Sequence, residues 1–197
     1  MAKSRVHGIF CLETDWWGVK GRATMEPVLQ LLHSVDYLQV PYIHRDIGTR
    51  EEFEHYLRKW MQKGLRRYPV LYLGFHGEER ALCVGERRGR HRLVTLDDLG
   101  ELLEGACKGR VIHFGSCSTL DVHGRSLSAF LRRTGAVAIM GYREWTDWVE
   151  VSAFEVLLLG ELQSASLTKR GMEALERRVR ASAPVFAKRL GFRMVVA

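Results

Sequence analysis

The chain has 197 residues, of which 46% are hydrophobic and 27% are charged. These are ordinary globular values, and they exclude a disordered or fibrous chain. The length predicts one well-filled domain spanning residues 1–197. The formal net charge of +7 makes the surface basic, which permits weak attraction to nucleic acid or acidic proteins but specifies neither.

The four cysteines have neither metal-knuckle nor redox-motif spacing, in a chain too large to need disulfides, so we expect thiols and a reducing cytoplasm. No signal-peptide core opens the chain, and no run approaches the roughly 20 apolar residues that cross a bilayer. We therefore expect a cytoplasmic protein, bacterial in style, without a membrane partner. No ligand pattern predicts a metal or cofactor. The cysteines are Cys11, Cys83, Cys107 and Cys117.

The chain opens with an apolar run, Val6 to Leu12, which predicts a buried strand. A loop follows from Glu13 to Gly21 and contains Trp16 and Trp17. These rings either form a lid or binding wall or pin the loop onto the core, and the second interpretation is favoured.

Two helices and a second strand come next. Thr24 caps a helix that ends near Val35, and Tyr37 to Ile43 is expected to be a strand. Thr49 with Glu52 three residues later is typical of a capping box. The second helix is therefore predicted to begin there and to end near residue 63.

The run from Pro69 to Glu79 predicts a central strand that delivers His76, followed at once by Gly77. Residues Ala81 to Val84 and His91 to Val94 flank the turn sequence GERRGR. Glycine and charged residues between short apolar runs predict a small antiparallel hairpin projecting from the main sheet.

The second half of the chain continues to alternate between helix and strand patterns. This alternation predicts an α/β fold with a mostly parallel central sheet flanked by helices. The expected elements are a helix from Thr95 to Gly105 or Gly109, a strand within Val111 to Thr119, a helix from Asp121 to Arg133, a strand from Ala136 to Gly141, helices from Trp148 to Leu162 and from Thr168 to Arg180, and a strand from Phe192 to Val196.

Two apolar runs end with residues that carry chemistry, His76 and Cys117. Ligands of parallel sheets gather at the carboxyl ends of strands, so the two side chains are expected to meet there. A thiol with a pKa of about 8.5 needs a neighbouring base to become a nucleophile. The backbone N–H groups of Gly77 and Cys117 would form an oxyanion hole. Asp121 opposes a thiolate, so His76 is expected to act mainly on the leaving amine and the hydrolytic water.

Each residue also has a structural interpretation. A lone cysteine is most often buried in a core, and a lone histidine is most often a hydrogen-bonding residue. We assign His113 to a strand interior and Cys107 to a helix end on these grounds. For His76 and Cys117 together, the strand ends and flanking glycines favour catalysis.

These residues resemble the caspase-like cysteine peptidases, and within them the bacterial CHAT-type proteins, which also resemble separase and gingipains. The resemblance is carried by Phe75-His-Gly77 and Gly115-Ser-Cys117, and it covers residues Val6 to Leu162. It implies a caspase-like three-layer sandwich with His76 and Cys117 as the dyad and Gly77 as an oxyanion donor.

The chain departs from the caspase pattern in two places. Only a helix and Thr134-Gly135 separate the cysteine segment from the next strand, so activation by chain cleavage is not expected. Caspases bind a substrate aspartate with basic residues, whereas the loop from Tyr142 to Trp148 reads YREWTDW. We expect Glu144, Trp145 and Asp147 to form a pocket that pairs with a substrate arginine or lysine, although Arg143 argues for the opposite charge.

The sequence therefore predicts a cysteine endopeptidase that acts on a protein or peptide and cleaves after a basic residue. CHAT-type proteins resemble effectors of bacterial defence or stress systems, which implies restraint by a separate regulatory protein or by oligomerisation. The alternative is a catalytically silent caspase-like interaction module. A nucleotide- or nucleic-acid-binding domain ranks last, because the chain has no phosphate loop and no GxGxxG pattern.

Overall fold

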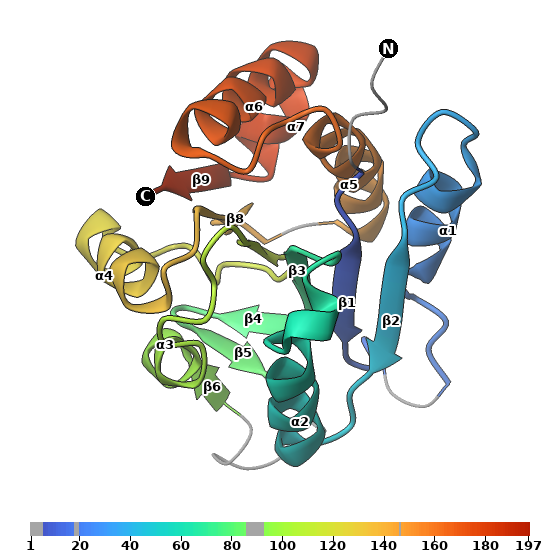
Figure 1. The fold of residues 1–197 in the computed structure, drawn as a ribbon. Coiled ribbons are helices and arrows are strands. Elements are labelled where there is room, and N and C mark those ends of the chain that lie inside the picture. The colour runs from blue at the N-terminus through green and yellow to red at the C-terminus, as the bar shows by residue number, and fades with distance from the viewer. Residues whose placement is uncertain (1–5, 18–19, 86–92, 146) are drawn as a thin grey trace.

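The computed structural model describes residues 6–17, 20–85, 93–145 and 147–197. A six-stranded sheet in the order β2-β1-β3-β7-β8-β9 forms the centre of the molecule (Figure 1). The pairs from β2 to β8 are parallel, and β9 is antiparallel to β8. The strands are β1 (Ile9–Glu13), β2 (Tyr42–Asp46), β3 (Val70–Gly74), β7 (Val111–Phe114), β8 (Ala138–Tyr142) and β9 (Phe192–Val196).

The helices cover both faces of this sheet (Figure 1). One apolar cluster joins the first face to α1 (Glu26–Ser34), α5 (Trp148–Leu162), α6 (Lys169–Ser182) and α7 (Pro184–Arg189). A second cluster joins the other face to α2 (Arg50–Trp60), α3 (Leu96–Leu102) and α4 (Gly124–Thr134). Every residue of β1, β3, β7 and β8 is buried, which explains their continuous apolar runs. The predicted three-layer α/β sandwich is confirmed.

The expected single strand from Pro69 to Glu79 is wrong, because the chain leaves the main sheet after Gly74. The neighbouring strands end at Glu13 and Phe114, so later residues have no partners there. They pair instead within a small antiparallel sheet in the order β4-β5-β6. His76 is thus the first residue of β4 and not the end of a long strand. The strands are β4 (His76–Glu78), β5 (Ala81–Cys83) and β6 (Leu93–Thr95).

The small sheet confirms the predicted antiparallel hairpin in part. Residues 86–92, which include most of the GERRGR turn and the start of the expected second hairpin strand, lie outside the described residues. The parts of the chain that are described pair Ala81 with Thr95 and Cys83 with Leu93.

The second strand of the main sheet begins later than expected. The carbonyl oxygen of Val35 accepts hydrogen bonds from the backbone of Leu38 and Gln39, both at 2.9 Å, which makes a turn. Tyr37 lies in this turn and is 86% exposed. The strand is an edge strand with partly exposed residues, so its apolar pattern is weak and the range predicted from the sequence starts too early.

The predicted and observed starts agree for the two helices that begin with a capping box. Thr49 with Glu52, and Thr95 with Asp98, each form both reciprocal hydrogen bonds. The helix expected from Asp121 instead begins at Gly124 without a side-chain cap. A short 3-10 turn, η1 (Lys63–Leu65), and the six-residue α7 were not predicted. None of the helices that the structure describes is long and apolar enough to span a membrane.

Candidate active site

The candidate site lies where the strand order reverses direction. The chain proceeds from β1 to β2 on one side and then to β3 on the other, so the topological switch point lies between β1 and β3. Glu13 and Gly74, their last residues, are register partners. The loop after β7 begins beside β3. Loops that converge at such a point form the usual ligand crevice of an open sheet.

His76 contacts the loop that follows β1. Its Nε2 lies 2.6 Å from the carbonyl oxygen of Trp16, and its ring meets the Trp16 indole edge-on at 5.2 Å. A carbonyl oxygen only accepts hydrogen bonds, so Nε2 carries the hydrogen. The basic nitrogen of the neutral ring is therefore Nδ1. The half-buried position of His76 keeps the ring accessible.

Gly77 brings the two predicted motifs into direct contact. A Cβ atom at Gly77 would lie 2.0 Å from the carbonyl oxygen of Cys117 and 2.4 Å from Oγ1 of Thr119. No side chain fits in that space, so glycine is required for the backbones to approach this closely. The turn that carries Cys117 therefore packs directly against the strand that begins with His76.

Cys117 is half-buried in a turn. Hydrogen bonds of Thr119 stabilise this turn. Thr119 Oγ1 donates to the carbonyl oxygen of Cys117 at 3.3 Å and lies 2.9 Å from Oγ of the buried Ser116. Ser118 has a φ of 56°, a left-handed conformation that costs a non-glycine residue about 1 kcal/mol. Such strained residues cluster at functional sites.

The other cysteines are less suited to react. Cys11 and Cys107 are buried thiols. Burial raises the pKa of the Cys107 thiol to about 12 and that of Cys11 well above its ordinary value. Cys83 and Cys117 are the two half-buried thiols, which makes Cys83 a natural comparison for Cys117.

The loop after β8 runs beside the Cys117 turn, as the sequence predicted. The N–H of Ser118 donates to the carbonyl oxygen of Glu144 at 3.4 Å, and the N–H of Leu120 donates to that of Tyr142 at 3.2 Å. The side chains of Glu144, Trp145 and Asp147 are exposed, with Trp145 at 77%.

Asp147 has a structural role that the sequence analysis did not assign. Its Oδ1 accepts from the N–H groups of Val149 and Glu150 at 2.9 and 3.1 Å, so Asp147 is the N-cap of α5. Both bonds use one carboxylate oxygen. Thr146, within the same predicted loop, lies outside the described residues.

A buried carboxylate beside the site was missed by sequence reasoning. Glu13 ends β1 and accepts hydrogen bonds from Trp16 Nε1 at 3.1 Å and from the N–H of Met25 at 3.0 Å. The hydroxyl of Thr24 also donates to it, and His44 Nε2 lies 2.5 Å from its Oε1. The indole of Trp16 is thus fixed by Glu13 while its carbonyl holds His76. The available signal was an acidic residue directly after an apolar strand.

The contacts of Glu13 and His44 determine the charge states of these two side chains. Burial alone would raise the pKa of Glu13, but the hydrogen bonds, led by that from His44, outweigh burial and lower the pKa. Burial likewise opposes protonation of His44, and Glu13 outweighs it, so the His44 pKa is raised. Ligand atoms of Glu13, His44 and Asp46 lie within 4.8 Å of one another. Because His44 Nε2 already faces Glu13 at 2.5 Å, we describe the group as an ion pair and not as a metal site.

A second buried polar network lies beneath the Cys117 turn. Glu155 Oε1 lies 2.5 Å from His113 Nε2 and accepts from the hydroxyl of Tyr142 at 2.7 Å and that of Tyr72 at 3.4 Å. All four side chains are buried, which confirms His113 as a strand-interior residue. A Cβ at Gly115 would lie 2.2 Å from the Tyr72 hydroxyl, so the network directly supports the turn.

Three tryptophans form an aromatic wall next to His76. Trp16 contacts Trp148 at 5.1 Å between ring centroids, and Trp17 contacts Trp148 at 5.7 Å. Trp16 is buried, as expected for a ring that pins the loop, whereas Trp17 is 61% exposed. Trp17 is therefore available to a ligand, and Trp148 is the last residue of the loop from Tyr142 to Trp148 that was expected beside the Cys117 strand.

Comparison with known proteins agrees with this fold. Caspase-1 from Spodoptera frugiperda has a similar structure, with a TM-score of 0.57 over 93% of this chain and 81% of that chain. The two sequences are 14% identical, so the likeness shows a caspase-like fold alone. No curated protein matches the sequence. The model of a family of unknown function, DUF6642, matches residues 6–195, and the chain belongs to that family.

Proposed function

We propose that the chain is a cysteine endopeptidase in which Cys117 is the nucleophile and His76 is its base. The observation that carries this proposal is the contact between Gly77 and the carbonyl oxygen of Cys117. It joins two motifs that each have an ordinary structural explanation alone. The orientation of His76 by the Trp16 carbonyl and the strained turn at Ser118 support the same assignment.

The proposed reaction follows from these groups. Nδ1 of His76 takes the thiol proton as Sγ of Cys117 attacks the scissile carbonyl. The N–H groups of Gly77 and Cys117 stabilise the oxyanion of the tetrahedral intermediate. The intermediate collapses to a thioester, and His76 gives its proton to the leaving amine. Water then attacks the thioester, gives a proton to His76 and releases the acid, and the proton returns to Cys117.

Cleavage after a basic residue is the proposed specificity. Glu144 and Asp147 place exposed carboxylates on the loop beside the Cys117 turn. The hydrogen bonds that cap α5 use Oδ1 of Asp147, and Oδ2, which lies outside the cap, is the proposed partner of a substrate arginine or lysine. The exposed rings of Trp145 and Trp17 would pack against the aliphatic part of that side chain.

Control by a separate regulatory protein or by oligomerisation, and a cytoplasmic location, belong to the same proposal. The CHAT-type resemblance supports the proposed control, and the spacing of the four cysteines supports the location. Constitutive proteolysis by the purified monomer would contradict the proposed control, but it would leave the proposed roles of His76 and Cys117 standing.

The test compares Cys117→Ala and His76→Ala with matched control variants. Cys83→Ala removes the other half-buried thiol, and His123→Ala removes an exposed histidine near the site. Cleavage of a fluorogenic peptide library should disappear in Cys117→Ala and fall by about a hundredfold or more in His76→Ala. Both controls should keep full activity, and circular dichroism should show all four variants folded.

Full activity in either dyad variant would overturn the proposal. Alkylation of Cys117 no faster than that of Cys83, together with protein binding but no cleavage, would support the silent interaction module instead.

A further inference from the structure

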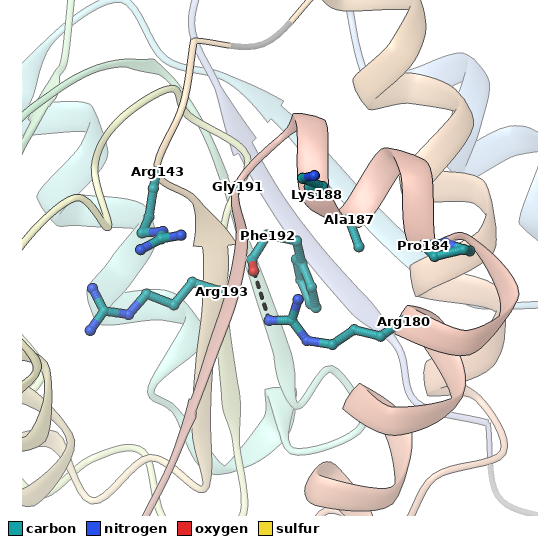
Figure 2. A pocket seen from close by; sticks show the side chains of 8 residues that line it. All are labelled: Arg143, Arg180, Pro184, Ala187, Lys188, Gly191, Phe192 and Arg193. Atoms are coloured by element: carbon teal, nitrogen blue, oxygen red, sulfur yellow. Dashed lines mark hydrogen bonds between the residues drawn. The ribbon is translucent and has the colours of Figure 1, made fainter.

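A basic pocket of about 500 Å³ lies between the end of β8, the start of β9 and the helices α6 and α7 (Figure 2). It is separate from the proposed dyad, and it lies at the end of the main sheet where β8 ends and β9 begins. Four of its eight lining residues are cationic. The lining residues are Arg143, Arg180, Pro184, Ala187, Lys188, Gly191, Phe192 and Arg193.

The positive charge of this basic pocket is largely uncompensated. Arg180 pairs with Glu176 at 2.9 Å. Within the part of the chain that the structure describes, no carboxylate forms an ion pair with Arg143, Lys188 or Arg193. Burial, and then the neighbouring Arg143, lower the pKa of Arg193, and Asp121 opposes this only in part. Two guanidinium groups are thus held close enough to repel each other.

Two of the cations are fixed, and two are adaptable. Arg193 donates through one nitrogen to the carbonyl oxygens of Leu120 and Val122 at 2.9 and 2.6 Å. Arg180 donates to the carbonyl oxygen of Phe192 at 2.9 Å. Arg143 and Lys188 are exposed and make no side-chain hydrogen bond to the described residues. Arg193 and Arg180 are already held in place, so binding a charged ligand costs little side-chain entropy at these two residues. Arg143 and Lys188 can adjust to the ligand.

We propose that the basic pocket binds a small anion that carries two or more phosphate groups. Guanidinium groups match phosphate oxygens with paired hydrogen bonds, and lysine adds a point charge. Figure 2 shows Arg143 and Arg193 together on one side of Phe192, with Lys188 above Phe192 and Arg180 below it, so the positive charge is spread around the basic pocket. An anion with several phosphate groups would engage more of these cations at once than a single carboxylate or phosphate would.

The small size of the basic pocket separates this proposal from binding of a macromolecule. A cavity of about 500 Å³ is the size of an ordinary small-molecule site, whereas nucleic acid is bound by basic faces that follow its backbone. The other arginine-rich part of the surface on α6, which includes Arg170 and Arg177, is exposed and contributes only Arg180 to the basic pocket.

The ligand would also stiffen the Cys117 turn. Arg193 holds the carbonyl oxygens of Leu120 and Val122, which lie three and five residues after Cys117. Gly191 packs so closely on the neighbouring loop that a Cβ there would lie 2.8 Å from Glu144 Cγ. A ligand that bridges Arg193, which already holds the segment after Cys117, and the adaptable Arg143 on the neighbouring loop would therefore restrain both loops of the candidate site. This inference does not require the protein to be a peptidase.

Isothermal titration calorimetry of the full chain with tripolyphosphate at physiological salt tests the site. The double variant Arg143→Gln/Lys188→Gln removes two cations that the fold does not use. The control variant Arg170→Gln/Arg177→Gln removes the same charge from exposed positions outside the basic pocket. We expect tripolyphosphate binding to weaken about tenfold or more in the first variant and to stay unchanged in the second.

Equal weakening in both variants would show charge attraction without a site and would overturn the proposal. It is also overturned if the chain binds no tripolyphosphate, or if orthophosphate, an acidic peptide or DNA binds as tightly as tripolyphosphate. Hydrogen exchange provides the second readout. Tripolyphosphate should slow exchange of the amides of residues 118–121 in the wild type and the control variant, and unchanged exchange would overturn the coupling to the Cys117 turn.

Discussion

Nε2 of His76 lies 2.6 Å from the carbonyl oxygen of Trp16, a contact that leaves Nδ1 as the basic nitrogen. This relationship makes a prediction that does not depend on activity. Nitrogen-15 NMR of the neutral ring should show the Nε2–H tautomer for His76, with an Hε2 proton protected from exchange. The exposed His123 is the control and should show rapid exchange. Protonation at Nδ1 in the neutral form would exclude the proposed role of His76.

The contact between Gly77 and Cys117 predicts an unusual cost for a small substitution. Gly77→Ala would place a methyl group 2.0 Å from a backbone carbonyl oxygen, and relief requires the two segments to separate. We expect a loss of about 1–3 kcal/mol in the free energy of unfolding, as for overpacked cores, together with loss of Cys117 reactivity.

The matched control is Gly64→Ala, where a Cβ would meet no atom within 4 Å. This change should leave stability unchanged or raise it by about 0.4–1 kcal/mol, because alanine restricts the unfolded chain. Urea denaturation measures both variants. Equal effects of the two substitutions would show that the close approach at Gly77 is not a constraint.

The central strands could be predicted from sequence because burial on both faces leaves a continuous apolar run. β7 and β8 were located from that signal alone. The edge strand β2 could not be placed, because its residues are partly exposed and alternate weakly. The position of His76 was misassigned because no local signal marks where β3 loses its neighbours and the chain turns into β4.

The candidate site could be predicted only for residues that lie within short motifs. His76, Gly77 and Cys117 follow apolar runs directly, so their proximity was an expectation from parallel topology. Glu13 contacts Trp16 in the next loop and also the more distant Met25 and His44, and no spacing rule reports such a set of contacts. The basic pocket joins residues 143, 180, 188 and 193, which become neighbours only through the antiparallel return of β9.

The buried network beneath the Cys117 turn predicts a ranking of two similar substitutions. The hydroxyl of Tyr142 donates to Glu155 at 2.7 Å, whereas that of Tyr72 is 3.4 Å away. Tyr142→Phe should therefore lower the free energy of unfolding by about 1–3 kcal/mol, the cost of removing one partner from a buried polar group. Tyr72→Phe should cost less, because its bond is near the limit of useful distance. Urea denaturation at neutral pH compares them, and the reverse order would contradict the network geometry.

The ion pair of Glu13 and His44 predicts a pH dependence of stability. The folded pKa of His44 is raised above its ordinary value of 6.5, so its stabilisation is present below that pH and is lost as pH rises through the folded pKa. The folded pKa of Glu13 is lowered from 4.5, so its stabilisation is lost as pH falls below that value. The pair contributes most between these two limits.

His44→Gln tests this dependence by urea denaturation from pH 4 to pH 9. The stability difference from the wild type should be largest near pH 5–6, on the order of 1 kcal/mol, and should shrink toward pH 9. His123→Gln, at an exposed position, should change stability at no pH. A difference that grows with rising pH would show that His44 is held in its neutral form.

The two roles of Asp147 can be separated because serine caps a helix without carrying charge. Asp147→Ala removes both the cap of α5 and the carboxylate, and should lower the free energy of unfolding by about 1 kcal/mol. Asp147→Ser keeps an acceptor for the N–H groups of Val149 and Glu150 and should cost only a few tenths of that. If Oδ2 binds a substrate cation, both variants should lose the preference for arginine or lysine to the same extent in a peptide-cleavage profile. A loss confined to Asp147→Ala would show that Asp147 acts only as the helix cap, and Glu144→Gln would then be the remaining test of an acidic pocket.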